Sequence, residues 1–321
     1  MSTALAPDSF AAPLPDQRRR RLAIAAILFA VVLWGVQFVM IRLAVTTTLS
    51  ATDIVVLRYL FALPTMIPIL WIYGRRPEER ISLPKAAALT VLGGAPLVLL
   101  SNFALEMAPA NHAACLQPGT VAVVSTLVLM LTSGVRKNWL IPAGVIIAVA
   151  GLAGVAFGGA GGVGTGPMTP VGDAILIVCG VMWASYTILL ARWKASPAVS
   201  TAWAAILSMV LLAPLLFVLP VKLGTAPWSD ILLHGVFQGF VNYTIAFLLW
   251  AFAARELGPV KMGFFAPLIP VSGVLSGIPL LGEWPLPFQW VGIAGVAVGL
   301  LCIALAQLRP QAGMTPMSGA S

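Results

Sequence analysis

Two pairs of side chains with recognisable chemistry stand at matching places in the two halves of the chain. Trp34 and Gln37 form the first pair, and Trp183 and Tyr186 form the second. Residues three apart share one face of a helix, so each pair would present an aromatic ring beside a hydrogen-bonding group. Two such faces could line a cavity for a ligand with an apolar body and a polar end. The alternative is that both tryptophans are interfacial or packing aromatics.

Amide side chains supply a second kind of chemistry. Asn102 with Glu106, and Gln238 with Asn242, are each four residues apart, which again places both members of a pair on one helical face. Amides at such positions could bind the carboxylate or the amine of a substrate. Hydrogen bonding between helices is the alternative.

Prolines mark further candidate positions. Gln117 precedes Pro118, and Pro267 and Pro270 occur in a later apolar stretch. A proline interrupts the helical hydrogen-bond ladder and leaves carbonyl groups that can face a cavity. The predicted substrate-binding residues are Trp34, Gln37, Asn102, Gln117, Trp183, Tyr186 and Asn242.

Three ionisable residues, Arg58, Glu106 and His112, are candidates for coupling or gating. Arg58 lies roughly two turns inside its apolar stretch, where a charge needs a partner. Glu106 is the first candidate partner and Asp53 the second, and a structural ion pair is one outcome. A carboxylate with His112 could instead take part in proton coupling. Arg42, at the end of the first stretch, is expected to extend to the lipid headgroups as an anchor.

Motifs of the common enzyme classes are missing from the sequence. It contains no G-x-S-x-G, no H-E-x-x-H and no Walker G-x-x-x-x-G-K-[ST], and it has only two histidines, His112 and His234. A formal G-x-G-x-x-G runs from Gly159 to Gly164, but it follows an apolar helix and not a soluble strand, so we interpret it as a flexible linker. We therefore expect no enzyme, no cofactor and no metal site.

The elements that must position these residues are membrane helices. Hydrophobic residues make up 60% of the chain and charged residues only 9%, which is far from the composition of soluble domains. Ten apolar stretches each approach the roughly 20 residues that span a bilayer, and alternating strands are absent. The predicted spans run near Leu22 to Ala44, Ile54 to Ile72, Ala86 to Met107, Ala113 to Leu131, Trp139 to Phe157, Val171 to Ala191, Ala198 to Leu219, Ile231 to Ala254, Val260 to Leu281 and Phe288 to Ala306.

The ten spans form two sets of five that match each other. Trp34 and Trp183 have the same separation as Pro118 and Pro267. Because five is odd, the second set must enter the membrane inverted, and inverted repeats build a substrate site at their interface. The predicted fold is an all-α integral membrane protein with ten transmembrane helices in two inverted five-helix repeats. Its predicted parts are a cytoplasmic tail (1–21), a first repeat (22–157), a glycine-rich extracellular linker (158–170), a second repeat (171–307) and a cytoplasmic tail (308–321).

Glycines recur in the last span of each repeat. Gly144 and Gly151 are seven residues apart, and so are Gly292 and Gly299. Small residues at that spacing let a membrane helix approach its neighbour closely.

Lysine and arginine residues are distributed unevenly among the predicted loops. Basic residues in short loops are retained on the cytoplasmic side; with the amino terminus inside, Lys222 is the one basic residue left in the outer loops. The sequence therefore predicts that both termini are cytoplasmic. The net charge of +8 reflects this topology and does not indicate nucleic-acid binding.

Several segments carry a family resemblance. LWGVQFVMIRLA from Leu33 to Ala44, followed by Arg58, resembles the start of EamA-type members of the drug/metabolite transporter superfamily. VGDAILIVCGVMWASYTILLAR from Val171 to Arg192 is similar to the sixth helix of that family, and Pro270 with Glu283 in LLGE, followed by QWVGIAGVAVG, is similar to its most recognisable stretch. The first repeat has LTSG where many members carry a second Leu-Gly-Glu, so symmetric gating is not implied.

The resemblance implies a secondary transporter of the bacterial cytoplasmic (inner) membrane that works by alternating access. Its expected substrates are amino acids or related small metabolites, and many members export them; an importer of a nutrient or vitamin-like metabolite is the alternative. Glu283 is expected to cap or brace the ninth helix at the outer face. The expected partners are a small-molecule substrate and the lipid bilayer, with no nucleic acid, and the protein is expected to be a monomer. Substrate identity, direction and ion coupling stay open.

Overall fold

The computed structural model describes residues 17–133, 138–158 and 161–308, and this part of the chain consists of helices and the loops between them. Helices satisfy every backbone hydrogen bond within one segment, which an apolar environment requires. The helices are α1 (Gln17–Thr47), α2 (Ala51–Tyr73), α3 (Leu83–Gly93), α4 (Ala95–Met107), α5 (Ala110–Ser133), α6 (Leu140–Phe157), α7 (Thr169–Arg192), α8 (Pro197–Leu215), α9 (Trp228–Gly235), α10 (Ala246–Leu257), α11 (Pro259–Met262), α12 (Leu268–Leu281) and α13 (Pro287–Leu308), with 3₁₀ turns η1 (Pro77–Glu79) and η3 (Gly263–Phe265) and a π-helix η2 (Val236–Ile245).

Within the described ranges, nine helical segments are long and apolar enough to cross a membrane, and α12 is a shorter apolar helix. In that count α3 with α4 forms one crossing, as do α9, η2 and α10 together. The predicted all-helical membrane fold is confirmed for these residues: the protein is a multi-pass membrane protein.

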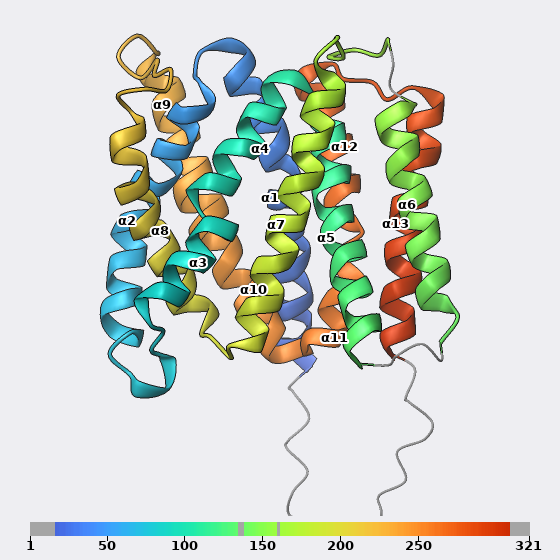
Figure 1. Cartoon of the computed structure of the whole chain (residues 1–321), viewed down its shortest axis with the longest axis horizontal. Helices are drawn as coiled ribbons and strands as arrows, with labels where there is room; N and C mark the ends of the chain where they lie inside the picture. Colours follow the sequence, from blue (N-terminus) through green and yellow to red (C-terminus); the bar gives the residue numbers. More distant parts are fainter. Residues whose placement is uncertain (1–16, 134–137, 159–160, 309–321) are drawn as a thin grey trace, which may run out of the picture.

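The bundle has two distinguishable ends (Figure 1). The first and last described residues, Gln17 and Leu308, lie at one end, which we call the terminal end. Residues 161–168 lie at the opposite end, which we call the linker end. In the interior α1 packs against α4, α5, α10, α12 and η2, so the helix that carries Trp34, Gln37 and Arg42 contacts both halves of the chain.

Three predicted spans are interrupted or distorted, and each has a local cause. The third divides at Gly94, because Pro96 in the first turn of α4 cannot donate to the ladder. The ninth divides into α11, η3 and α12, and Pro267 stands at the start of α12. The eighth stays continuous but winds as a π-helix through η2, a geometry that is common at functional sites.

The helices α6 and α13 form a closely packed pair at one side of the bundle (Figure 1). A Cβ added at Gly151 would lie 2.5 Å from the backbone N of Val296 and 2.7 Å from the carbonyl O of Gly292. At Gly299 it would lie 2.6 Å from the Gly144 carbonyl O. The expectation that these glycines permit close helix approach is confirmed, since their backbones are in direct contact.

Candidate functional site

A buried arginine organises a polar cluster inside the bundle. The Nη1 of Arg58 on α2 donates to Gln37 Oε1 on α1 and to Gln238 Oε1 on η2, each at 3.2 Å. Its guanidinium carbon lies 5.4 Å from the ring centroid of Tyr243, also on η2, which is a cation–π distance. We call Gln37, Arg58, Gln238 and Tyr243 the central cluster. It joins residues from both halves of the chain.

The position of the central cluster follows from helix geometry and from one small residue. Arg58 lies about 10 Å along α2 from Ala51 at the linker end, well inside a hydrocarbon core of about 30 Å, and the residue is only 8% exposed. Gly239 lets η2 approach α2, because a Cβ there would lie 2.6 Å from the Arg58 carbonyl O. Gln238 is thereby brought within reach of the guanidinium.

The predicted partners of Arg58 do not bind it, and that part of the prediction is wrong. The Asp53 carboxylate accepts hydrogen bonds from the backbone N–H groups of Ser50 and Lys222, at 2.8 and 2.9 Å. Glu106 is exposed and accepts from the backbone N–H of Ala51 at 3.2 Å. Both carboxylates therefore serve the free N–H groups at the start of α2, where the helix dipole also favours negative charge.

Asn242 and Trp34 lie beside the central cluster. The Asn242 amide Nδ2 donates to the Leu33 carbonyl at 3.0 Å, and its Oδ1 is buried without a partner among the described residues. Trp34 is partly buried and packs against two apolar clusters that include Ala246 and Ala253 of α10. Although Trp34 and Gln37 share a helix, only Gln37 reaches the guanidinium.

The second aromatic pair lies on α7. The rings of Trp183 and Tyr186 are in contact, with centroids 5.9 Å apart. Trp183 follows the buried Leu176 and Cys179 at helical spacing but is 38% exposed. A Cβ added at Gly93 would lie 2.7 Å from the Tyr186 ring, which therefore packs at the break between α3 and α4.

Tyrosines connect this face of α7 to the central cluster. The Tyr59 and Tyr243 rings meet edge to face, with centroids 5.6 Å apart. The Arg58 guanidinium lies over the Tyr243 ring, and Tyr186 of α7 lies near both tyrosines. Sequence reasoning passed over Tyr59 and Tyr243, although each directly follows a residue that it singled out as polar and deeply placed, Arg58 and Asn242.

The other predicted binding residues make hydrogen bonds between helices. Asn102 Nδ2 donates to the Ala51 carbonyl at 3.1 Å, which joins α4 to α2. Gln117 Oε1 accepts from the Ser101 hydroxyl at 2.9 Å, which joins α5 to α4. Both side chains act as interhelical links in this structure, and their contact with a substrate stays a prediction.

A second polar network lies at the linker end, around Arg42. Its Nε lies 3.3 Å from Glu283 Oε1, and its Nη1 and Nη2 donate to the carbonyl groups of Leu105 and Gly164, at 2.6 and 3.2 Å. Arg42 is only 9% exposed, so the prediction that it extends to the headgroups is wrong. A carboxylate and two carbonyls of the protein bind the guanidinium and hold it inside.

Glu283 connects this network to α5. Its Oε2 accepts from the backbone N–H of Ala110 at 2.7 Å. Burial raises the pKa of Glu283 above its ordinary value, and the Ala110 N–H and the Arg42 guanidinium offset only part of this rise. Glu283 braces α1 and the start of α5 in this way.

The pKa of Glu283 predicts a pH-dependent stability. Because burial raises this pKa in the folded state, the carboxyl contributes stability below its unfolded pKa, and that contribution is lost as the pH rises through the folded pKa. Glu283→Gln keeps an oxygen acceptor but cannot titrate, so we expect its midpoint of thermal unfolding to depend less on pH than that of the wild type. If the unfolding midpoint depends on pH in the same way in both proteins, a raised pKa of Glu283 is not the cause of that dependence.

His112 completes the linker-end network. Its Nδ1 lies 2.8 Å from Asp173 Oδ1 on α7, and its Nε2 lies 2.7 Å from Gln289 Nε2 on α13. Gln289 Oε1 accepts from the backbone N–H of Leu286 at 2.8 Å, so the Gln289 amide nitrogen is the donor to His112 Nε2. Because Nε2 accepts this hydrogen bond, the ring proton is on Nδ1, which donates to Asp173. The sequence singled out His112 but not Gln289.

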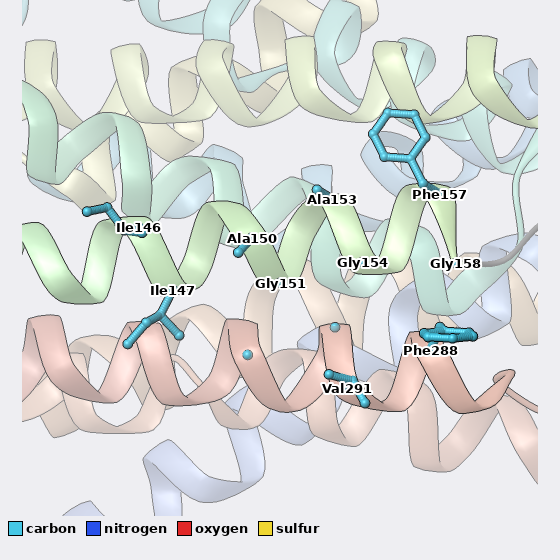
Figure 2. A pocket seen from close by; sticks show the side chains of 12 residues that line it. Ile146, Ile147, Ala150, Gly151, Ala153, Gly154, Phe157, Gly158, Phe288 and Val291 are labelled. Carbon is cyan, nitrogen blue, oxygen red and sulfur yellow. The ribbon is translucent and has the colours of Figure 1, made fainter.

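The central cluster and the linker-end network contrast with a groove on the outside of the α6–α13 pair (Figure 2). The groove encloses about 620 Å³ and is lined by apolar residues and glycines such as Ile147, Phe157, Phe288 and Val291. It offers no side chain that could bind a polar substrate. Within the described residues no group of three His, Cys, Asp or Glu could hold a metal ion.

The family model and the curated relatives that match this chain point to the same class of protein. The model of the EamA-like transporter family matches residues 21–157 and again residues 170–305. The chain is 29% identical over 233 residues to a "Probable terminal-alkyne amino-acid exporter" of Streptantibioticus cattleyicolor, covering 71% of this chain and 75% of that protein. It is 26% identical over 245 residues to "Uncharacterized transporter YdeK" of Bacillus subtilis, covering 73% and 78%. A crystal structure whose name states no function shares the fold, with a TM-score of 0.59, 21% identity and coverage of 88% of this chain and 96% of that one.

Proposed function

The chain belongs to the EamA-like transporter family, and on that premise we propose that it is a secondary transporter that exports amino acids or related small metabolites. The relative named as a probable terminal-alkyne amino-acid exporter, 29% identical to this chain, supports the substrate class and the direction. The central cluster supports a polar substrate, since a cation deep in a membrane bundle marks a substrate or ion pathway.

The proposal includes a topology. The segments 22–157 and 171–307 are two five-helix repeats in inverted orientation, joined by the extracellular linker 158–170. The terminal end, with the tails 1–21 and 308–321, faces the cytoplasm of a bacterium, and the chain acts as a monomer in the inner membrane. The excess of lysine and arginine in loops at the terminal end supports this orientation.

Alternating access would operate between the two polar regions. The linker-end network joins α1 and α5 of the first repeat to Glu283, Asp173 and Gln289 of the second, and it acts as the outer gate in its closed state. The central cluster lies between that gate and the terminal end. Substrate binding then involves the residues predicted from sequence, which are Trp34, Gln37, Asn102, Gln117, Trp183, Tyr186 and Asn242, and coupling or gating involves Arg58, Glu106 and His112.

Flux through proteoliposomes tests the proposal. The purified protein is reconstituted, and labelled amino acids, vitamins and other small metabolites are screened with and without an imposed pH gradient. Saturable amino-acid flux is the expected result, and its acceleration by a pH gradient would support proton coupling through His112. Movement of a vitamin-like nutrient alone would favour the importer, and no flux under any gradient would contradict a transport function.

Trp183 gives the first mutational test. Its ring is partly exposed, so it is available to contact the apolar part of a substrate, and Trp183→Ala should lower transport about tenfold. Trp228→Ala is the matched control, because Trp228 lies at the start of α9 and is largely exposed. Membrane expression of both variants should equal that of the wild type. If Trp183→Ala and Trp34→Ala both transport at the wild-type rate, the aromatic pairs do not line the path.

A further inference from the structure

One edge of the Arg58 guanidinium is unused, and we infer that this edge binds a carboxylate of the transported substrate. The inference rests on the proposed transport function and adds to it the chemical group that the site recognises. The ligand class is a small carboxylate with an apolar body, including α-amino acids.

The hydrogen bonds of Arg58 leave a complete fork free. Both acceptors within the described residues, Gln37 Oε1 and Gln238 Oε1, bind the same nitrogen, Nη1. Nε is buried without a partner, and Nη2 makes no hydrogen bond among the described residues. Nε and Nη2 form one edge of the planar guanidinium, and their two parallel N–H groups match the two oxygens of a carboxylate.

The charge of Arg58 points to the same ligand. Its neighbours within the described chain are two neutral amide oxygens and the face of the Tyr243 ring. These groups stabilise a cation but do not neutralise it, and an uncompensated charge at membrane depth is costly. The carboxylates of Asp53 and Glu106 are occupied by backbone N–H groups at the start of α2. A bound carboxylate would supply the missing negative charge.

The π-helix η2 offers a second polar contact for such a ligand. Asn242 lies on η2 with Gln238, and its Oδ1 is buried and has no hydrogen-bond donor among the described residues. An amide oxygen can accept from an ammonium group, so Asn242 can bind the amine of an amino acid while Arg58 binds its carboxylate. The paired rings of Trp183 and Tyr186, of which Tyr186 lies near Tyr243, suit the apolar body.

Matched ligands test the assignment on the purified full-length protein in detergent. The probes are L-leucine, L-phenylalanine and 4-methylpentanoate, the amides L-leucinamide and L-phenylalaninamide, the amines 3-methylbutylamine and phenethylamine, and inorganic phosphate. Binding is followed by the shift in thermal unfolding and by tryptophan fluorescence. The carboxylates are expected to bind, and each amide or amine is expected to bind about tenfold to a hundredfold more weakly, as for lost hydrogen bonds to a charged group.

Variants of Arg58 separate its role from a structural one. Arg58→Gln removes the charge, and Arg58→Lys keeps the charge but not the fork; both should lose the preference for carboxylates over amides. Arg192→Gln is the matched control, because Arg192 is exposed at the end of α7. If Arg58→Gln fails to fold, Arg58→Lys carries the test.

The inference would be overturned by equal binding of acids and amides by the wild type, by a carboxylate preference that survives in the folded Arg58 variants, or by tighter binding of phosphate than of any carboxylate. No carboxylate-dependent shift with any probe would count against it equally. A different result would contradict the proposed transport function. If 4-methylpentanoate binds through Arg58 but no amino acid crosses the bilayer, the carboxylate site stands and amino-acid transport does not.

Discussion

Gly151→Ala is expected to separate α6 from α13 and to lower the free energy of unfolding by about 3 kcal/mol. The added methyl group would lie 2.5 Å from the Val296 backbone N and 2.7 Å from the Gly292 carbonyl O. Both contacts are backbone atoms of a helix, which cannot rotate away as a side chain can. Thermal unfolding in detergent should show a clear fall in the midpoint.

Gly277→Ala is the matched control for this prediction. Gly277 is also inside a membrane helix, α12, but a Cβ there would meet only a Val39 methyl group at 3.8 Å, an ordinary contact. Alanine is favoured over glycine within a helix by about 0.5–1 kcal/mol, so this variant should be as stable as the wild type or more so. If the two substitutions change the stability equally, the direct backbone contact between α6 and α13 does not require glycine at Gly151.

Arg42→Ala is the second substitution with a large expected effect. It leaves the buried Glu283 carboxylate without its cation and frees the carbonyl groups of Leu105 and Gly164. Removing one partner of a buried pair costs about 3–5 kcal/mol. The variant should be less stable and should open the linker end. Its readouts are thermal unfolding and the labelling rate of Cys115, a buried cysteine on α5 near that end, by a membrane-impermeant maleimide.

A double-mutant cycle separates the pair from general damage. Glu283→Gln removes the charge that Arg42→Ala leaves unpaired, so the double variant should be more stable than the sum of the two single effects predicts. Cys179, buried on α7 against α4, serves as the labelling control and should stay protected. Two results would contradict the view that the Arg42–Glu283 pair closes the linker end. One is additive losses in stability, and the other is unchanged labelling of Cys115 in Arg42→Ala.

Features that depend on local sequence could be predicted well. Span length follows from hydropathy, and the spacing of Gly144, Gly151, Gly292 and Gly299 was enough to expect a close contact between helices. Those patterns act within one helix or at one interface. The interruption of the ninth span was likewise indicated by its prolines.

Pairings between distant residues could not be predicted. Arg42 and Glu283 are 241 positions apart, and their contact depends on how α1 packs beside the end of α12. The depth of Arg58 within its apolar stretch indicated that its charge needs a partner. Glu106 and Asp53 are not that partner, because the free N–H groups at the start of α2 bind both carboxylates. Gln238 was selected as an amide on a helical face, yet its contact with the guanidinium depends on the close approach that Gly239 permits.

Counterflow is the most direct test of transport by alternating access. Proteoliposomes that contain the purified protein are loaded with a high concentration of an unlabelled amino acid that moves in the flux screen, and are diluted into a trace of the same amino acid carrying a label. A transporter whose single site opens to each side in turn should accumulate the label transiently above its equilibrium level, without any imposed gradient of ions. Entry of the label only to equilibrium, at a rate independent of the internal amino acid, would contradict the account.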